Sequence, residues 1–292
     1  MAADNLVRKG KENWSMVIQP KSKWLALNLG DVWKYRDLLM LFVRRDFVAV
    51  YKQTILGPAW FFIQPILTTI TFTIIFGTIA KIPTDDLPQI LFYMSGITAW
   101  SYFADCINKT SKIFVANANI YGKVYFPRLI TPLSIVISNL IKFGIQFLLF
   151  SAFLAYYLIT TDSVHPNVYM LLLPVLVLMM AGFGMGLGLI ISSMTTKYRD
   201  LTHLVTFGVQ LLMYGTTVAY PLSIMEGKSE LIRQIVMLNP MTPIIEAFRY
   251  AFMGAGELSF FHLAYSATVI GILMIVGIII FNRTEKSFMD TV

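Results

Sequence analysis

Charged side chains inside apolar stretches are the residues of this sequence with the most evident chemistry. Lys142 stands in NLIKFGIQF, and Glu246 and Arg249 stand three residues apart in IIEAFRY. A charge inside a membrane costs on the order of several kcal/mol unless it is paired or hydrated. We therefore expect Lys142 either to pair with an acid or reach a membrane edge, or to contact an anionic substrate. Glu246 and Arg249 can pair on one helix, either to hold a hairpin together or as a gating contact.

Basic residues also gather directly before the first long apolar segment. Arg44, Arg45 and Lys52 lie, with Tyr51, in FVRRDFVAVYKQTILGPAWFFIQP. Apolar residues at helical spacing accompany them, which predicts an amphipathic helix lying along the membrane surface. Its cations can then meet anionic head groups or an acidic partner.

Motifs for catalysis are absent from the sequence. The glycine-rich run GFGMGLG, residues 182–188, lacks the lysine and hydroxyl of a phosphate-binding loop, so it predicts close helix packing instead. His165, His203 and His262 are scattered and lack metal-ligand spacing. The acidic pair Asp85-Asp86 is typical of a solvated turn. We therefore expect no enzymatic site, no metal and no cofactor in this chain, and no hydrolysis of ATP by it.

The composition is that of an integral membrane protein. Of the 292 residues, 57% are hydrophobic and only 13% are charged, and the mean hydropathy is +0.67. Soluble domains carry about 25% charged residues. The net charge of +7 would suggest nucleic-acid binding in a soluble protein, but here we attribute it to membrane topology and expect no nucleic-acid partner.

Six segments are apolar and long enough to cross a membrane, for which about 20 residues are needed. They are residues 59–80, 90–107, 129–160, 168–194, 201–222 and 263–281. A seventh stretch, residues 231–253, is interrupted by Asn239-Pro240 and charged residues, and it predicts two short helices that dip into the membrane. The expected fold is thus an all-α polytopic membrane protein with a re-entrant helical hairpin before the last span.

The distribution of lysine and arginine predicts the orientation. These residues are concentrated in the first 57 positions, in the linkers 105–128 and 195–200, and in the C-terminal tail. Cytoplasmic segments carry such an excess, so both termini are expected in the cytoplasm. We expect three parts: a cytoplasmic arm (1–30), an interface helix with its turn (31–57) and a six-helix membrane domain (58–292).

Two of the cytoplasmic linkers have the composition of docking sites. Residues 112–132, KIFVANANIYGKVYFPRLITP, combine aromatic residues, cations and a short helix that ends before proline. Residues 194–203 contain KYRDL. Each is either a surface for a separate motor protein or an ordinary solvated loop.

Four motifs together resemble the permease subunit of a type-2 ABC exporter, and more narrowly the branch that exports O-antigen, capsule and teichoic acid polysaccharides. They are YKQTILGPAWFFIQP, GKVYFPRLITPLS, KYRDL and LNPMTPIIEAFRY. The resemblance covers about residues 31–281. It implies a multi-pass protein of the bacterial inner membrane that works as a homodimer in export linked to lipopolysaccharide biosynthesis. Two copies of a separate ATPase would bind ATP and Mg, and a polyprenyl-pyrophosphate-linked glycan would pass along the dimer interface.

The resemblance also implies roles for individual residues. The interface helix and residues 116–126 would contact the ATPase, and the hairpin with Glu246 and Arg249 would cap the exit. The ATPase-coupling residues would be Tyr121, Lys123, Tyr125, Phe126, Lys197 and Arg199. The pyrophosphate would enter past Arg44, Arg45, Tyr51 and Lys52, although cations are expected on this face in any case. Aromatic residues that either line the channel or pack against lipid or the core are Trp60, Phe62, Phe72, Trp100, Tyr102 and Phe103.

Other functions remain open at this stage. A type-2 exporter of a drug or lipid would share the same scaffold. An integral membrane glycosyltransferase or acyltransferase would need acids or a histidine clustered at one membrane face, and the sequence has no such cluster. A scaffold without transport is a further alternative. The glycan itself is not indicated by any motif.

Overall fold

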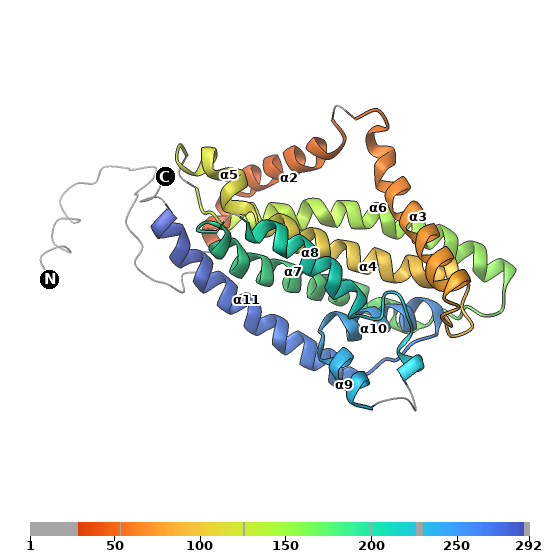
Figure 1. The fold of residues 1–292 in the computed structure, drawn as a ribbon. Coiled ribbons are helices and arrows are strands. Elements are labelled where there is room, and N and C mark those ends of the chain that lie inside the picture. Colours follow the sequence, from red (N-terminus) through yellow and green to blue (C-terminus); the bar gives the residue numbers. More distant parts are fainter. Residues whose placement is uncertain (1–28, 53, 125, 199, 226–229, 289–292) are drawn as a thin grey trace, which may run out of the picture.

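The computed structural model describes residues 29–52, 54–124, 126–198, 200–225 and 230–288, which are helical and contain no strand. The long helices run along one bundle (Figure 1): α4 (Gln89–Thr110), α6 (Ile130–Thr160), α7 (Leu173–Thr195) and α11 (Phe260–Phe288). The helix α5, the first turns of α2 and the last turns of α11 lie at one end, called here the α5 end. The helices α9 and α10 lie at the other, called the α10 end. Most of the expected N-terminal arm, residues 1–30, lies outside the described residues.

The segment before the first span forms two helices rather than one. The helix α1 is Leu29–Lys34 and α2 is Arg36–Tyr51, and Tyr35 between them departs from helical backbone (φ −98°, ψ 22°). The amphipathic character of α2 is confirmed, since Phe42 and Val43 are buried while Arg44 is exposed. Because α2 packs on α6, part of its apolar face covers protein.

Among the residues that the structure describes, four helical stretches are long and apolar enough to cross a membrane. They are Gly57–Ile79, Ile130–Thr160, Val168–Thr195 and Phe260–Glu285. The first combines η1 (Gly57–Ala59), α3 (Trp60–Phe72) and η2, a π-helical segment (Thr73–Ile79). The others correspond to α6 (Ile130–Thr160), η3 (Val168–Leu172) with α7 (Leu173–Thr195), and α11 (Phe260–Phe288). These four agree with the first, third, fourth and sixth predicted segments.

The two remaining predicted segments differ from those four. The helix α4, Gln89–Thr110, has 22 residues but buries polar side chains such as Ser95 and Thr98 in the centre of the bundle. The helix α8 is shorter than predicted and spans Leu201–Tyr214. The prediction that it continues to residue 222 was wrong, because Gly215 ends the helix and the chain then runs irregularly to η4, Leu222–Met225.

The glycine-rich run places α7 between two neighbouring helices. A Cβ on Gly184 or Gly188 would lie 2.6 Å from the Cβ atoms of Cys106 or Thr110 on α4. A Cβ on Gly186 would lie 3.1 Å from the backbone nitrogen of Met274 on α11. Alternate glycines thus face opposite partners, which confirms the predicted close packing.

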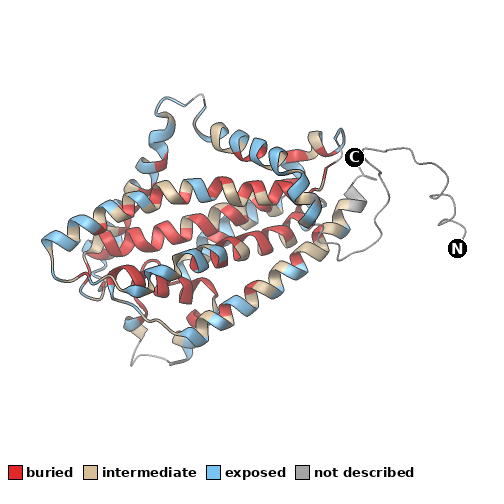
Figure 2. Ribbon diagram, turned by 180° about the vertical axis from the view of Figure 1, so that it is seen from behind, coloured by how far each residue is buried: buried red, intermediate tan, exposed pale blue. Residues whose placement is uncertain are grey.

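The stretch before α11 forms two short helices, as predicted. The helix α9 is Glu230–Leu238 and α10 is Met241–Met253. Buried residues concentrate along the inner helices, whereas α2, α3 and α11 carry many exposed residues (Figure 2). Nearly all of α10 is buried, and Gly254 ends it in the left-handed conformation (φ +75°). The second helix of the hairpin is therefore part of the core at the α10 end, whereas α9 keeps Leu231, Ile235 and Leu238 exposed.

Candidate functional site

Aromatic rings at the α5 end join three parts of the chain that are distant in sequence. The helix α5 spans Ile113–Tyr121. The rings of Phe42 on α2 and Phe126 in the linker after α5 meet edge to face, with centroids 5.6 Å apart. The ring of Phe114 on α5 stacks on Phe281 of α11 at 4.8 Å. Packed rings thus join α2 to the linker and α5 to α11.

Tyr121 is the polar centre of this aromatic cluster. Its side chain is 2% exposed, and its hydroxyl shares a hydrogen bond with the Thr131 hydroxyl on α6. Burial raises the pKa of Tyr121, so the hydroxyl stays protonated and serves as a hydrogen-bonding group. The guanidinium of Arg128 lies 5.0 Å from the Tyr121 ring centroid, and its Nε lies 3.5 Å from Oε1 of Glu285 on α11.

Sequence reasoning missed Arg128 as a site residue. It lies inside the linker that was singled out, but its partner Glu285 is 157 positions away. The Nη1 group also donates a hydrogen bond to the Glu285 carbonyl oxygen at 3.1 Å. The only signal available beforehand was a cation placed just before an apolar span.

The other predicted coupling residues are partly at the surface. Lys123 is exposed beside a pocket of about 250 Å³, which is lined by Tyr121, Gly122, Lys123, Val124, Phe126, Arg128 and Glu285. Lys197 is exposed just after α7, at the same end, where the Thr195 hydroxyl donates to the Ser111 carbonyl oxygen at 2.8 Å. Tyr125 and Arg199 lie outside the described residues. The structure thus brings Tyr121 and Phe126 together as buried anchors and leaves Lys123 and Lys197 accessible.

The predicted entry cations fall into two kinds. Arg44 and Lys52 are exposed on and just after α2. Arg45 is also exposed, with 40% of its side-chain surface accessible, but it contacts Asp46 at 2.8 Å and donates a hydrogen bond to Oδ1 of Asn117 on α5 at 3.4 Å. Tyr51 is the last residue of α2, and its side chain lies outside the description. Arg45 therefore ties α2 to α5, while the other two cations face outward.

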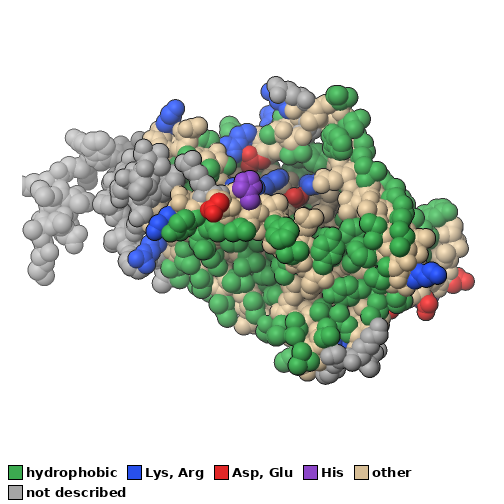
Figure 3. Space-filling view, in the orientation of Figure 1, with side chains coloured by type: hydrophobic (Ala, Val, Ile, Leu, Met, Phe, Trp, Pro, Cys, Tyr) green, Lys and Arg blue, Asp and Glu red, His purple; other side chains and the backbone are tan. Residues whose placement is uncertain are grey.

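A hollow on one face of the bundle is called here the groove (Figure 3), and the helices α4 and α6, on which α3 packs, are called its floor. The helix α3 packs on both floor helices, and α8 packs on α4. Basic, acidic and histidine side chains gather in the groove beneath α2 and α3, on a face that is otherwise largely apolar (Figure 3). Toward the α10 end η2 and α8 approach each other, because the rings of Phe76 and Tyr214 lie 6.5 Å apart.

The floor of the groove carries two polar contacts between α4 and α6. The Lys142 Nζ lies 2.7 Å from Asp105 Oδ2, so the predicted pairing with an acid is confirmed. The Lys109 Nζ donates a hydrogen bond to Asn139 Oδ1 at 2.7 Å. The side chains of Lys142 and Asp105 keep 17% and 28% of their surface exposed.

The aromatic residues proposed to line a channel fall into an exposed group and a buried group. Trp60 and Phe62 on α3 are 43% and 41% exposed. The other four are buried in the core cluster at 7% exposure or less: Phe72, Trp100, Tyr102 and Phe103. In this structure those four take the alternative role, core packing: α6 and α7 pack around the three on α4, and the Phe72 ring of α3 meets Tyr93 of α4.

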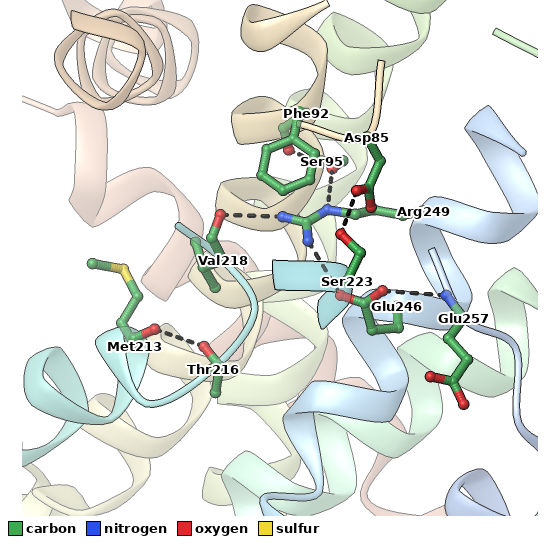
Figure 4. Close-up of polar contacts among 10 residues, drawn as sticks. All are labelled: Asp85, Phe92, Ser95, Met213, Thr216, Val218, Ser223, Glu246, Arg249 and Glu257. Atoms are coloured by element: carbon green, nitrogen blue, oxygen red, sulfur yellow. Dashed lines mark hydrogen bonds and ion pairs between the residues drawn. The ribbon is translucent and has the colours of Figure 1, made fainter. Parts of the chain in front are cut away.

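A buried ion pair holds the α10 end together (Figure 4). Arg249 Nη1 lies 3.3 Å from Glu246 Oε1, as the spacing predicted, and both side chains are 1% exposed. Arg249 also donates hydrogen bonds to the Val218 carbonyl oxygen at 3.1 Å and to Ser95 Oγ at 3.3 Å. Its guanidinium lies 3.7 Å from the centroid of the Phe92 ring. One side chain thereby links α10, α4 and the segment after α8.

Further polar contacts surround this pair. The backbone N–H of Glu257 donates to Glu246 Oε2 at 3.3 Å, and Arg233 pairs with Glu257 at 2.7 Å. Asp85 and Asp86 both lie in a turn, and the Ser223 hydroxyl donates to the partly exposed Asp85. A cavity of about 410 Å³ is lined by Asp85, Leu222, Ser223, Arg233, Glu246, Gly256 and Glu257. Within the described ranges, no three His, Cys, Asp or Glu residues gather as a metal site.

Comparisons with known proteins agree with these features. The family described as ABC-2 type transporter matches residues 37–253. An O-antigen export system permease protein, RfbA, of Klebsiella pneumoniae is 28% identical over 267 residues, which cover 91% of this chain and 98% of the relative. A protein of the same name from Myxococcus xanthus is 28% identical over 225 residues, 76% of this chain and 82% of the relative.

Proposed function

Because the chain belongs to the ABC-2 type transporter family, we propose that it is the membrane-spanning subunit of an ATP-driven polysaccharide exporter. The proposed substrate is a polyprenyl-pyrophosphate-linked glycan of the O-antigen kind, which moves across the bacterial inner membrane. The observation that carries the proposal is the likeness to O-antigen export permeases over nearly the whole length of both chains.

In the proposed topology six helical segments cross the membrane. They are α3 with η2, α4, α6, α7, α8 and α11. The concentration of lysine and arginine in the segments of the α5 end supports a cytoplasmic location for this end and for both termini. The α9–α10 hairpin would then enter the membrane from the outside and cap the exit. The buried Glu246–Arg249 pair would hold that cap against α4.

The groove supports assembly as a homodimer. Its floor carries the charged residues Asp105, Lys109 and Lys142, and charged groups facing lipid would be costly. A second copy facing the groove would enclose these groups in a hydrated path between the subunits. Trp60 and Phe62, which are exposed on α3, would offer aromatic surface to sugar faces along that path.

The α5 end supports docking of a separate ABC ATPase, two copies per dimer, on which ATP and Mg would bind. The exposed Lys123 and Lys197 would contact the motor, and the buried rings behind the linker would carry its motion into α2 and α11. Tyr125 and Arg199 belong to the same proposed surface. Arg44 and Lys52 on α2 would receive the pyrophosphate head group at the membrane surface.

Purification from native membranes tests this function. The expected result is a stoichiometric partner that bears a phosphate-binding loop, with ATP hydrolysis that rises when lipid-linked glycan is added. A Lys123→Glu variant should stay in the membrane and lose export, with Lys81→Glu, an exposed lysine far from the linker, as the matched control. Stimulation by a small amphiphile but not by glycan would point to the drug or lipid exporter. A homodimer without any ATPase would refute the proposal.

A further inference from the structure

We propose that Lys109 and Lys142, on the groove floor, form a subsite for the diphosphate of a lipid head group. The Asp105 carboxylate competes with the diphosphate for Lys142. The inference rests on the proposed export function and extends it from the membrane surface into the bundle. It assigns a role to charged residues that are expensive to keep at this depth.

Lys142 lies in the first half of the 31-residue helix α6, inside an apolar segment long enough to cross a membrane. The residue lies twelve positions into α6, which at 1.5 Å per residue corresponds to about 18 Å from the start of that helix. The hydrocarbon core of a membrane is about 30 Å thick. A charge inside an apolar membrane-spanning helix is typically part of a substrate or ion path.

The two lysines belong to one short ladder across α4 and α6. Asp105 and Lys109 are one turn apart on α4, and Asn139 and Lys142 are one turn apart on α6. The rungs Lys142–Asp105 and Lys109–Asn139 are both 2.7 Å long. The two ammonium groups therefore lie on adjacent levels of the same floor, with Lys109 closer to the α5 end.

The charges of the ladder do not cancel. Asp105 can neutralise one lysine, but Asn139 offers Lys109 only a neutral amide oxygen. The four groups together carry one net positive charge. The side chains of Lys142 and Asp105 also remain partly exposed to the groove, so an incoming anion can reach them.

The ladder suits a diphosphate better than a phosphodiester. Two phosphoryl groups can engage two ammonium groups with charge-assisted hydrogen bonds, and their higher charge can displace the Asp105 carboxylate from Lys142. The phosphodiester of a bulk lipid carries one negative charge, so it competes less well with the same carboxylate for Lys142. Return of Lys142 to Asp105 would then release the diphosphate. The exposed Arg44 and Lys52 would bind the diphosphate first, at the membrane surface.

A binding measurement on the complete transporter in nanodiscs tests the subsite. The probes are a C55 polyprenyl diphosphate, the corresponding monophosphate and phosphatidylglycerol, and binding is followed by native mass spectrometry. The variants are Lys109→Gln and the neutral pair Lys142→Gln/Asp105→Asn, which keeps the hydrogen bond without the charges. Lys81→Gln removes an exposed cation far from the groove and is the matched control.

We expect the diphosphate to bind most tightly to the unaltered protein. Both groove variants should weaken it about tenfold or more, and the control should not change it. In the Asp105→Asn variant the affinity for phosphatidylglycerol should rise toward the affinity for the diphosphate. Equal diphosphate binding by all variants would overturn the subsite. Equal affinity of phosphatidylglycerol for the unaltered protein would also overturn it, as a general lipid site. Since binding is measured without ATP hydrolysis, loss of the subsite is distinguishable from failure of the export proposal, which shows as a missing ATPase.

Discussion

Replacing Arg249 by Met tests how much the buried pair contributes to stability. Arg249 makes an ion pair, two further hydrogen bonds and a ring contact, all at 1% side-chain exposure. Removing it leaves Glu246 buried without its cation, and breaking one side of a buried pair costs about 3–5 kcal/mol. We expect the variant to lose a large part of its folding stability, with the α10 end loosening first.

The appropriate assay is thermal unfolding in detergent, followed by size-exclusion chromatography of the protein that remains folded. A double variant, Glu246→Leu/Arg249→Met, is the matched control because it removes both charges together. Replacing a buried pair by apolar residues of similar volume is often neutral or stabilising, so the double variant should unfold at a higher temperature than the single one. A single variant as stable as the unaltered protein would refute the reasoning.

Three further predictions follow from the packing and the α5 end. Gly184→Leu should destabilise the bundle by about 1–3 kcal/mol or more, because the leucine side chain would overlap α4. Gly271→Ala, at a position with open space around it, should be nearly neutral in the same unfolding assay. Arg128→Gln should uncouple ATP hydrolysis from export by loosening the linker from α11; normal coupling in a joint ATPase and export assay would contradict this. Arg45→Gln should weaken ATPase binding in a pull-down, because it removes the contact between α2 and α5. Arg44→Gln should lower export and leave assembly with the ATPase intact. Equal effects of the two variants would count against different roles for the two arginines.

The amino-acid sequence determined those features that depend on neighbours along the chain. Low charge and long apolar runs require a membrane protein of helices. The alternate glycines of residues 182–188 predict close packing whatever the partner, and Glu246 and Arg249 meet because a helix brings residues three apart onto one face. The interruption at Asn239-Pro240 likewise divides the hairpin into two short helices.

Only the tertiary structure decided which residues meet across the bundle. The acid that pairs with Lys142 is 37 positions away, and the partner of Arg128 is 157 positions away. The burial of Trp100 and the exposure of Trp60 also depend on which helices surround each ring. A helical pattern indicates that a face is apolar but not whether protein, lipid or a channel covers it. That choice is made by the packing of segments distant in sequence, where close backbone contacts and charge pairing outweigh the conformational preference of each segment alone.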